Sequence, residues 1–238
     1  MIDTSAGPGR PTVTYTLIGV CCLVFAVSPA SGLNPGYGTG GALLEARAAF
    51  FERWGVVPGS LWNGPSAEAL TPLTALFVHG NWLHLLGNIL FLYVFGAMAE
   101  ERMGRLQFTL FYLVTGYLAL VGYAAAHADS TQTLVGASGA ISGVLGAFLW
   151  LFPRARVTSL FPFLLFLPLR FPAWAVLIFW FALQWLAIRQ EGPRPGVAYL
   201  AHLVGFVLGF LFAWARFGRE SKGRGAPSLE GGGGRREG

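Results

Sequence analysis

Long apolar runs alternate along this chain with short segments that carry most of the charged residues. Hydrophobic residues make up 54% of the 238 positions and charged residues only 11%, whereas soluble domains carry about 25% charged residues. A helix needs about 20 consecutive apolar residues to cross a bilayer core. Six runs reach or approach that length, near residues 12–28, 80–99, 106–126, 135–152, 171–188 and 197–216. We therefore expect an integral membrane protein with an all-α fold, a single bundle of six transmembrane helices.

The apolar runs divide the chain into three parts. Residues 1–11 are expected to form a cytoplasmic N-terminal tail, and residues 12–216 the six-helix membrane domain. Residues 217–238 are rich in Gly, Arg and Glu, a composition typical of disorder. We expect this last part to be a disordered cytoplasmic tail.

Two connections between the runs carry apolar residues of their own. The long loop at 29–79 contains Phe50 and Trp54, and is therefore expected to lie on the membrane surface. The stretch 159–169 is apolar but interrupted by prolines. Because proline breaks regular helices, we interpret that stretch as an irregular connection or an interfacial segment.

The positions of Lys and Arg predict the orientation in the membrane, because cytoplasmic loops are enriched in both. With the N-terminus inside, the inner segments hold twelve of the 16 basic residues, and the outer segments hold Arg47, Arg53, Arg189 and Arg194. We expect a multi-pass protein with both termini cytoplasmic, in a bacterial cytoplasmic membrane. The net charge of +5 is spread over these short segments and the tail, which indicates membrane orientation and no nucleic-acid partner.

Four polar side chains near the starts of apolar runs are candidates for function, because polar groups in lipid are costly. Ser138 lies near the start of the fourth run and His202 near the start of the sixth. His84 and Asn88 are four residues apart in the second run, and so share one helix face. With the N-terminus inside, these three runs all cross from outside to inside. The four side chains are therefore expected at a similar depth in the outer leaflet.

Pairs of glycines predict which helices approach closely. Gly139 and Gly143 are four residues apart in the fourth run, and Gly205 and Gly209 have the same spacing in the sixth. Small residues at this spacing let two helix backbones pack closely. We expect the fourth and sixth helices to pack through these faces.

This packing would bring Ser138 towards His202, which is the pairing that an activated serine nucleophile requires. His84 and Asn88 would then supply N–H donors to a developing oxyanion. A third, acidic member is not evident: the only aspartates are Asp3 in the N-terminal tail and Asp129 in the loop before the fourth run. Glu100 and Glu101 fall at the inner end of the second run. We therefore expect a Ser–His dyad in which packing, rather than a carboxylate, orients the imidazole.

At these residues the sequence resembles the rhomboid family of intramembrane serine proteases, over about residues 54–216. The second run matches its H-x4-H-x3-N pattern with His79, His84 and Asn88. The other matching motifs are the nucleophile motif Gly136-Ala137-Ser138-Gly139, the base motif Ala201-His202-Leu203-Val204-Gly205, and the structural turn Glu100-x-Arg102-x-Gly104.

The resemblance implies a role for each of these side chains. Ser138 would be the nucleophile and His202 the general base. His84 and Asn88 would be oxyanion donors beside the Ser138 backbone N–H, and His79 a supporting residue. The substrates would be transmembrane segments of membrane proteins in the lipid bilayer, reaching the site between the second and fifth helices. No metal or cofactor is implied.

Two departures from the family pattern concern residues around the site. Leu70 and Thr71 stand where some members carry a Trp-Arg pair in the first loop. Ser142 stands where some members carry an aromatic residue that stacks on the base. The sequence therefore names neither the anchor of the loop nor the aromatic partner of His202.

Two other functions fit a polytopic membrane protein. The first is a non-catalytic rhomboid-fold binder or chaperone of transmembrane helices, against which the retention of both Ser138 and His202 argues. The second is a transporter, which predicts internal inverted repeats, and we find none. An intramembrane serine protease is the function that the sequence favours.

Overall fold

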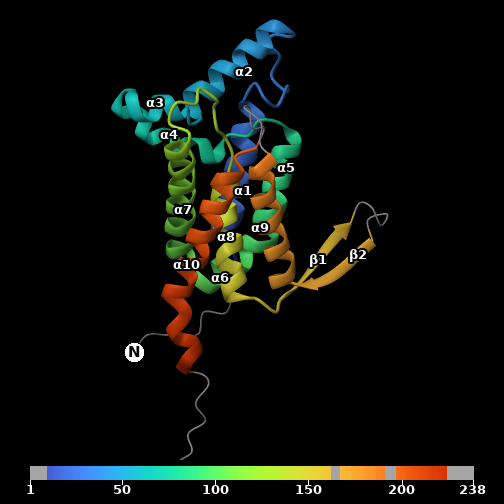
Figure 1. Ribbon diagram of the computed structural model, residues 1–238. Helices are drawn as coiled ribbons and strands as arrows, with labels where there is room; N and C mark the ends of the chain where they lie inside the picture. The colour runs from blue at the N-terminus through green and yellow to red at the C-terminus, as the bar shows by residue number, and fades with distance from the viewer. Residues whose placement is uncertain (1–9, 162–166, 191–196, 224–238) are drawn as a thin grey trace, which may run out of the picture.

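Six apolar helical segments pack side by side in the computed structural model, which describes residues 10–161, 167–190 and 197–223 (Figure 1). The first is α1 (Thr12–Val27), and the second joins α5 (Trp82–Phe91), the π-helical turn η4 (Leu92–Gly96) and α6 (Ala97–Met103). The others are α7 (Arg105–Ala126), α8 (Ser138–Leu151), α9 (Ala173–Gln190) and α10 (Tyr199–Gly223). The predicted helical bundle is thus present.

Four of these segments, within the part of the chain that the structure describes, are long and apolar enough to cross a bilayer. They are Trp82–Met103, Arg105–Ala126, Ala173–Gln190 and Tyr199–Gly218. The helices α1 and α8 are apolar but shorter. An integral membrane protein is therefore supported, whereas six crossings stay a prediction.

The chain that connects α1 to α5 forms short helices, which lie at one end of the bundle (Figure 1). They are η1 (Pro35–Tyr37), α2 (Gly41–Trp54), α3 (Pro58–Asn63), η2 (Ser66–Leu70), α4 (Thr71–Thr74) and η3 (Ala75–Phe77). Two side chains tie them to α7: Trp62 Nε1 donates to the Ala124 carbonyl at 3.1 Å, and Tyr117 donates its hydroxyl to the Ala69 carbonyl at 3.2 Å. These bonds anchor the first loop in a chain that lacks the Trp-Arg pair.

Two paired strands lie at the two ends of the stretch 159–169, which was expected to be an irregular connection or an interfacial segment. The described residues are therefore mostly helical, and the all-α prediction is wrong for these strands. Strand β1 (Arg156–Phe161) pairs antiparallel with β2 (Leu167–Pro172), with Arg156 opposite Pro172 and Phe161 opposite Leu167. The hairpin projects sideways beside the start of α9 (Figure 1). Val, Thr and Phe favour strands, and proline is tolerated there because both strands of a hairpin are edges.

The last helix is longer than the sequence indicated. We expected the membrane domain to end at residue 216 and the tail to be disordered from 217, but α10 continues to Gly223. The added residues include Arg, Glu and Lys, which have high helix propensity. The rest of the expected tail, 224–238, and most of the N-terminal tail, 1–9, lie outside the described residues.

The start of α1 is fixed by a buried carboxylate. Glu100 in α6 is 2% exposed, and its two oxygens accept hydrogen bonds from the backbone N–H groups of Val13 and Thr14 at 2.9 and 2.7 Å. The Thr14 hydroxyl donates a third bond at 2.8 Å. The first N–H groups of a helix have no intrahelical partner, so Glu100 both satisfies them and joins the first helix to the second.

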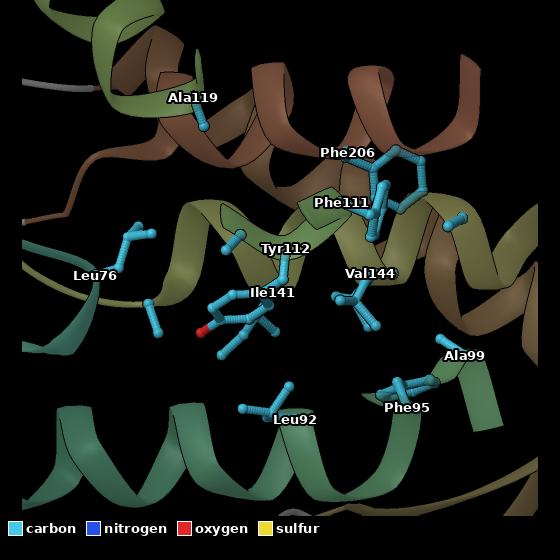
Figure 2. Close-up of a cluster of buried hydrophobic side chains, with 14 of the residues drawn as sticks. Leu76, Leu92, Phe95, Ala99, Phe111, Tyr112, Ala119, Ile141, Val144 and Phe206 are labelled. Atoms are coloured by element: carbon cyan, nitrogen blue, oxygen red, sulfur yellow. The ribbon is translucent and has the colours of Figure 1, made fainter. Parts of the chain in front are cut away.

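The apolar core surrounds α8, whose residues 139–148 are all buried. Figure 2 shows Leu92 and Phe95 facing Tyr112, Ile141 and Val144 from the neighbouring segments. Phe95 also meets Phe148 edge to face, with ring centroids 4.9 Å apart. Because α8 is enclosed by other helices, its length need not match the bilayer.

The helices α8 and α10 approach each other through glycine, as the sequence predicted. A Cβ added at Gly205 would collide with the carbonyl oxygen of Gly139, and one at Gly209 with that of Gly143. A Cβ at Gly146 would likewise collide with the carbonyl of Phe206. These clashes are with backbone, which side-chain rotation cannot relieve.

We predict that Gly209→Ala destabilises the protein, because its methyl group forces the backbones of α8 and α10 apart. Such overpacking costs about 1–3 kcal/mol, and thermal unfolding in detergent micelles measures it. Gly19→Ala is the matched control, since a Cβ at Gly19 meets nothing within 4 Å. Alanine favours helix over glycine, so the control should be neutral or slightly stabilising. An unchanged Tm for Gly209→Ala would contradict close packing.

Candidate active site

Ser138 is the first residue of α8 and directly follows a sharp turn of the backbone. Gly136, two residues earlier, has φ +125, a region that favours glycine. Its N–H donates to the Ala75 carbonyl at 2.9 Å, which fixes the turn against η3. No side chain caps the start of α8, so the first N–H groups of this helix stay available near Ser138.

Ser138 and His202 are brought into hydrogen-bond contact, with Oγ and Nε2 2.8 Å apart. His202 lies in the first turn of α10 and is 8% exposed. The two residues are 64 positions apart in the chain. Their contact follows from the glycine faces of α8 and α10, because Gly139 and Gly205 flank them on the two helices.

A third residue, Gln184 of α9, binds the other nitrogen of the imidazole. Its Oε1 lies 2.8 Å from His202 Nδ1. Packing alone was expected to orient this ring, and Gln184 was not among the residues predicted from the sequence. The available signal was a glutamine inside an apolar run, which the cost of polar groups in lipid marks as a candidate.

Aromatic partners of His202 also come from outside α8. The Trp180 ring of α9 lies beside the imidazole, with centroids 6.1 Å apart and planes inclined by 32°. Tyr199 meets it edge to face at 6.2 Å. Ser142 instead donates its hydroxyl to the Ser138 carbonyl at 2.6 Å. The aromatic residue absent from position 142 is thus replaced by one from α9.

His84 lies across the site from His202, on α5. A Cβ added at Gly136 would lie 2.7 Å from His84 Nε2, so only glycine leaves room for this ring beside the turn. The Gly80 N–H points to His84 Nδ1 at 3.4 Å. With Nδ1 as acceptor, a neutral imidazole carries its hydrogen on Nε2, which faces the turn before Ser138.

Asn88 is bound within its own helix. Its Nδ2 donates to the His84 carbonyl at 2.7 Å, and its side chain is 9% exposed. An amide nitrogen carries two hydrogens, so this bond leaves one for another acceptor.

His79 lies behind His84 and does not line the cavity. Its ring meets His84 edge to face at 5.2 Å, and it is 1% exposed. Its Nδ1 lies 3.3 Å from the Phe77 carbonyl. Burial, with a smaller effect of the neighbouring His84, lowers the pKa of His79 to about 4. His79 is therefore neutral near pH 7, and its ring contact with His84 links it to the site.

A cavity of about 520 Å³ joins the polar groups of the site. Ser138, His202, His84 and Asn88 all line it, together with Trp180 of α9. Residues 132–135 of the loop before α8 line it as well. A serine hydroxyl in hydrogen-bond contact with an imidazole, with N–H donors nearby, is an arrangement suited to acyl transfer. Among the described residues, no three His, Cys, Asp or Glu side chains gather to hold a metal ion.

Comparison with known proteins gives one family throughout. The family model described as Rhomboid domain matches residues 66–219. Rhomboid protein 1, mitochondrial, of Saccharomyces cerevisiae is 33% identical over 142 residues, which cover 58% of this chain and 39% of that protein. The Rhomboid protease GluP of Bacillus subtilis is 32% identical over 144 residues, covering 60% and 25%.

A third relative matches over a shorter region. Rhomboid-like protein 11, chloroplastic, of Arabidopsis thaliana is 44% identical over 73 residues, which cover 30% of this chain and 25% of that protein. The matched region thus spans between 25% and 39% of the length of these three relatives.

Proposed function

This chain belongs to the rhomboid family, and we propose that it is an intramembrane serine protease. Its substrates are transmembrane segments of membrane proteins, cleaved in or near the bilayer. The observation that carries the proposal is the 2.8 Å contact between Ser138 Oγ and His202 Nε2. The cavity beside that contact supports it, because it is large enough for a short peptide segment.

The proposed reaction begins when Ser138 Oγ attacks the scissile carbonyl and His202 Nε2 takes its proton. The negative charge develops on the carbonyl oxygen, which backbone N–H groups at the start of α8, His84 Nε2–H and the free hydrogen of Asn88 stabilise. The imidazolium then gives its proton to the leaving amine, which leaves an acyl-enzyme. Water, deprotonated by His202, releases the second product and restores Ser138.

We further propose that α1 and α8 cross the membrane with the four longer segments. α8 is enclosed in protein, so its 14 residues need not reach both lipid surfaces. Six crossings place both termini on one side, and the distribution of Lys and Arg favours the cytoplasm. The named relatives come from organelles and a bacterium, so a bacterial cytoplasmic membrane stays a prediction.

Substrates are proposed to reach the cavity between α5 and α9. Of the segments long enough to cross a bilayer, α9 is the least enclosed, with 11% of its apolar window buried against 44% for α10. Its exposed face carries Trp174, Phe179 and Trp185. A helix so little held by its neighbours can yield to a substrate helix at small cost.

We predict that Ser138→Ala and His202→Ala each abolish cleavage of single-span substrates in proteoliposomes. Members of a catalytic unit are strongly non-additive, so the double variant should be no slower than either single variant. The expected loss is on the order of 10⁴-fold or more in kcat. Ser66→Ala, at an exposed position in η2, and His127→Ala are the controls.

The same experiment separates the protease from the non-catalytic binder. A fluorophosphonate reacts only with an activated serine, so it should label the unmodified protein and not Ser138→Ala. Folded protein that neither cleaves nor takes the label would favour the binder. Measurable proteolysis by Ser138→Ala would exclude Ser138 as the nucleophile.

We predict that Asn88→Ala lowers kcat with little change in KM, because the oxyanion forms only after attack. Loss of one oxyanion donor costs about 10² to 10³ in turnover. We expect the lower end, since other donors remain. Asn63→Ala, at an exposed position at the end of α3, is the control. Normal kcat per folded molecule with a reduced Tm would assign Asn88 to helix structure alone.

We predict that the C-terminus is cytoplasmic. A C-terminal reporter enzyme that is active only outside the cytoplasm should give no signal, while one that is active only inside should. The reverse result would overturn the orientation, and with it the expectation that the site opens towards the outer leaflet.

A further inference from the structure

We propose that Gln184 is a positioning residue that sets the tautomer of the catalytic base, an inference that rests on the proposed function. Its amide oxygen accepts a hydrogen bond from His202 Nδ1–H, which keeps the hydrogen on Nδ1 and leaves Nε2 free to accept from Ser138. The base would thus be aligned by a side chain from α9, a helix other than its own.

The two ring nitrogens of His202 each have a hydrogen-bond partner, and these partners indicate the tautomer. Gln184 Oε1 is an acceptor and lies 2.8 Å from His202 Nδ1, so this contact is a hydrogen bond only in the tautomer that carries its hydrogen on Nδ1. A neutral imidazole has one N–H. In this tautomer Nε2 has no hydrogen and carries a lone pair. That lone pair faces Ser138 Oγ at 2.8 Å, which makes Ser138 the donor. With the hydrogen on Nε2 instead, the ring would donate to Ser138 and take no proton from it.

An amide suits this position better than a carboxylate in one respect. A carboxylate buried among apolar helices carries a large desolvation cost, and an amide oxygen accepts the same bond without a net charge. Of the two partners, His202 is buried at 8% exposed and Gln184 is half-buried. Serine, imidazole and amide therefore form a chain of hydrogen bonds with no net charge in the resting state.

The hydrogen bond between Gln184 and His202 connects the proposed base to the part of α9 that is least enclosed. Its buried residues are Ala173 and Leu177, and among residues 178–190 none is buried. Beyond Leu177, Trp180 and Phe181 pack on His202 and Phe206, with ring centroids 5.0 to 6.1 Å apart. Gln184 lies one turn further, so the alignment of His202 depends on α9 being seated against α10.

Three variants separate the acceptor from the shape of the side chain. Gln184→Met keeps the length and removes the acceptor, and should lower kcat about 10- to 100-fold with KM little changed, because a buried N–H loses its partner. Gln184→Glu restores an acceptor oxygen and should turn over much faster than Gln184→Met. Gln190→Met, the same change at an exposed position of α9, should match the unmodified protein.

Nitrogen NMR of protein labelled with ¹⁵N-histidine reads the tautomer without needing activity. With four histidines in the chain, the His202 signals are assigned by their absence in His202→Ala. The unmodified protein should show hydrogen on Nδ1, and Gln184→Met should lose that preference. Hydrogen on Nε2 in the unmodified protein would overturn the proposal, since the amide would then be donating to the ring.

The outcomes also separate this inference from the proposed function. If the unmodified protein cleaves and Gln184→Met cleaves at the same rate, the positioning role is wrong and the protease stands. If the unmodified protein neither cleaves nor reacts with a fluorophosphonate, the protease is wrong, and the NMR result alone decides whether Gln184 holds the Nδ1–H tautomer. If Gln184→Met and Gln184→Glu have the same kcat, the acceptor oxygen is not what matters at this position, and the proposal is wrong.

Discussion

The close approach of α8 and α10 is the contact on which the rest of this structure depends. Glycines on both helices bring backbone against backbone, at Gly205 beside Gly139 and at Gly209 beside Gly143. Helix association in lipid gains little from the hydrophobic effect and relies on packing of this kind. A larger residue at Gly205 or Gly209 would push α10 away from α8 and so separate Ser138 Oγ from His202 Nε2.

Buried polar groups supply the second constraint, because each one needs a partner where water is scarce. Glu100 takes three hydrogen bonds from the start of α1, and Gln184 binds His202. In both cases the partner belongs to another helix. The same bonds therefore satisfy costly groups and fix the relative positions of helices that lipid alone would leave free.

Much of the fold followed from apolar runs and small-residue spacing, which are local patterns. They predicted the helices, the glycine contact and the approach of Ser138 to His202. The hairpin at β1 and β2 was missed because prolines suggested an irregular segment, while edge strands tolerate them. Gln184 was not predicted because a third catalytic group is usually a carboxylate, and an amide in an apolar run does not resemble one. The Trp180 ring beside His202 was equally hidden, since the expected aromatic position on α8 is Ser142.

The sequence by itself determined that this chain is a membrane protein, roughly where its six apolar segments lie, and which glycines, serine and histidines are candidates. Composition and spacing are enough to identify membrane helices, because a backbone in lipid must satisfy its own hydrogen bonds within a helix. Only the tertiary structure decided what meets His202 from α9, because Gln184 is 18 positions away, on another helix. Which face a helix turns to its neighbour depends on the packing of the whole bundle, and no local pattern records it.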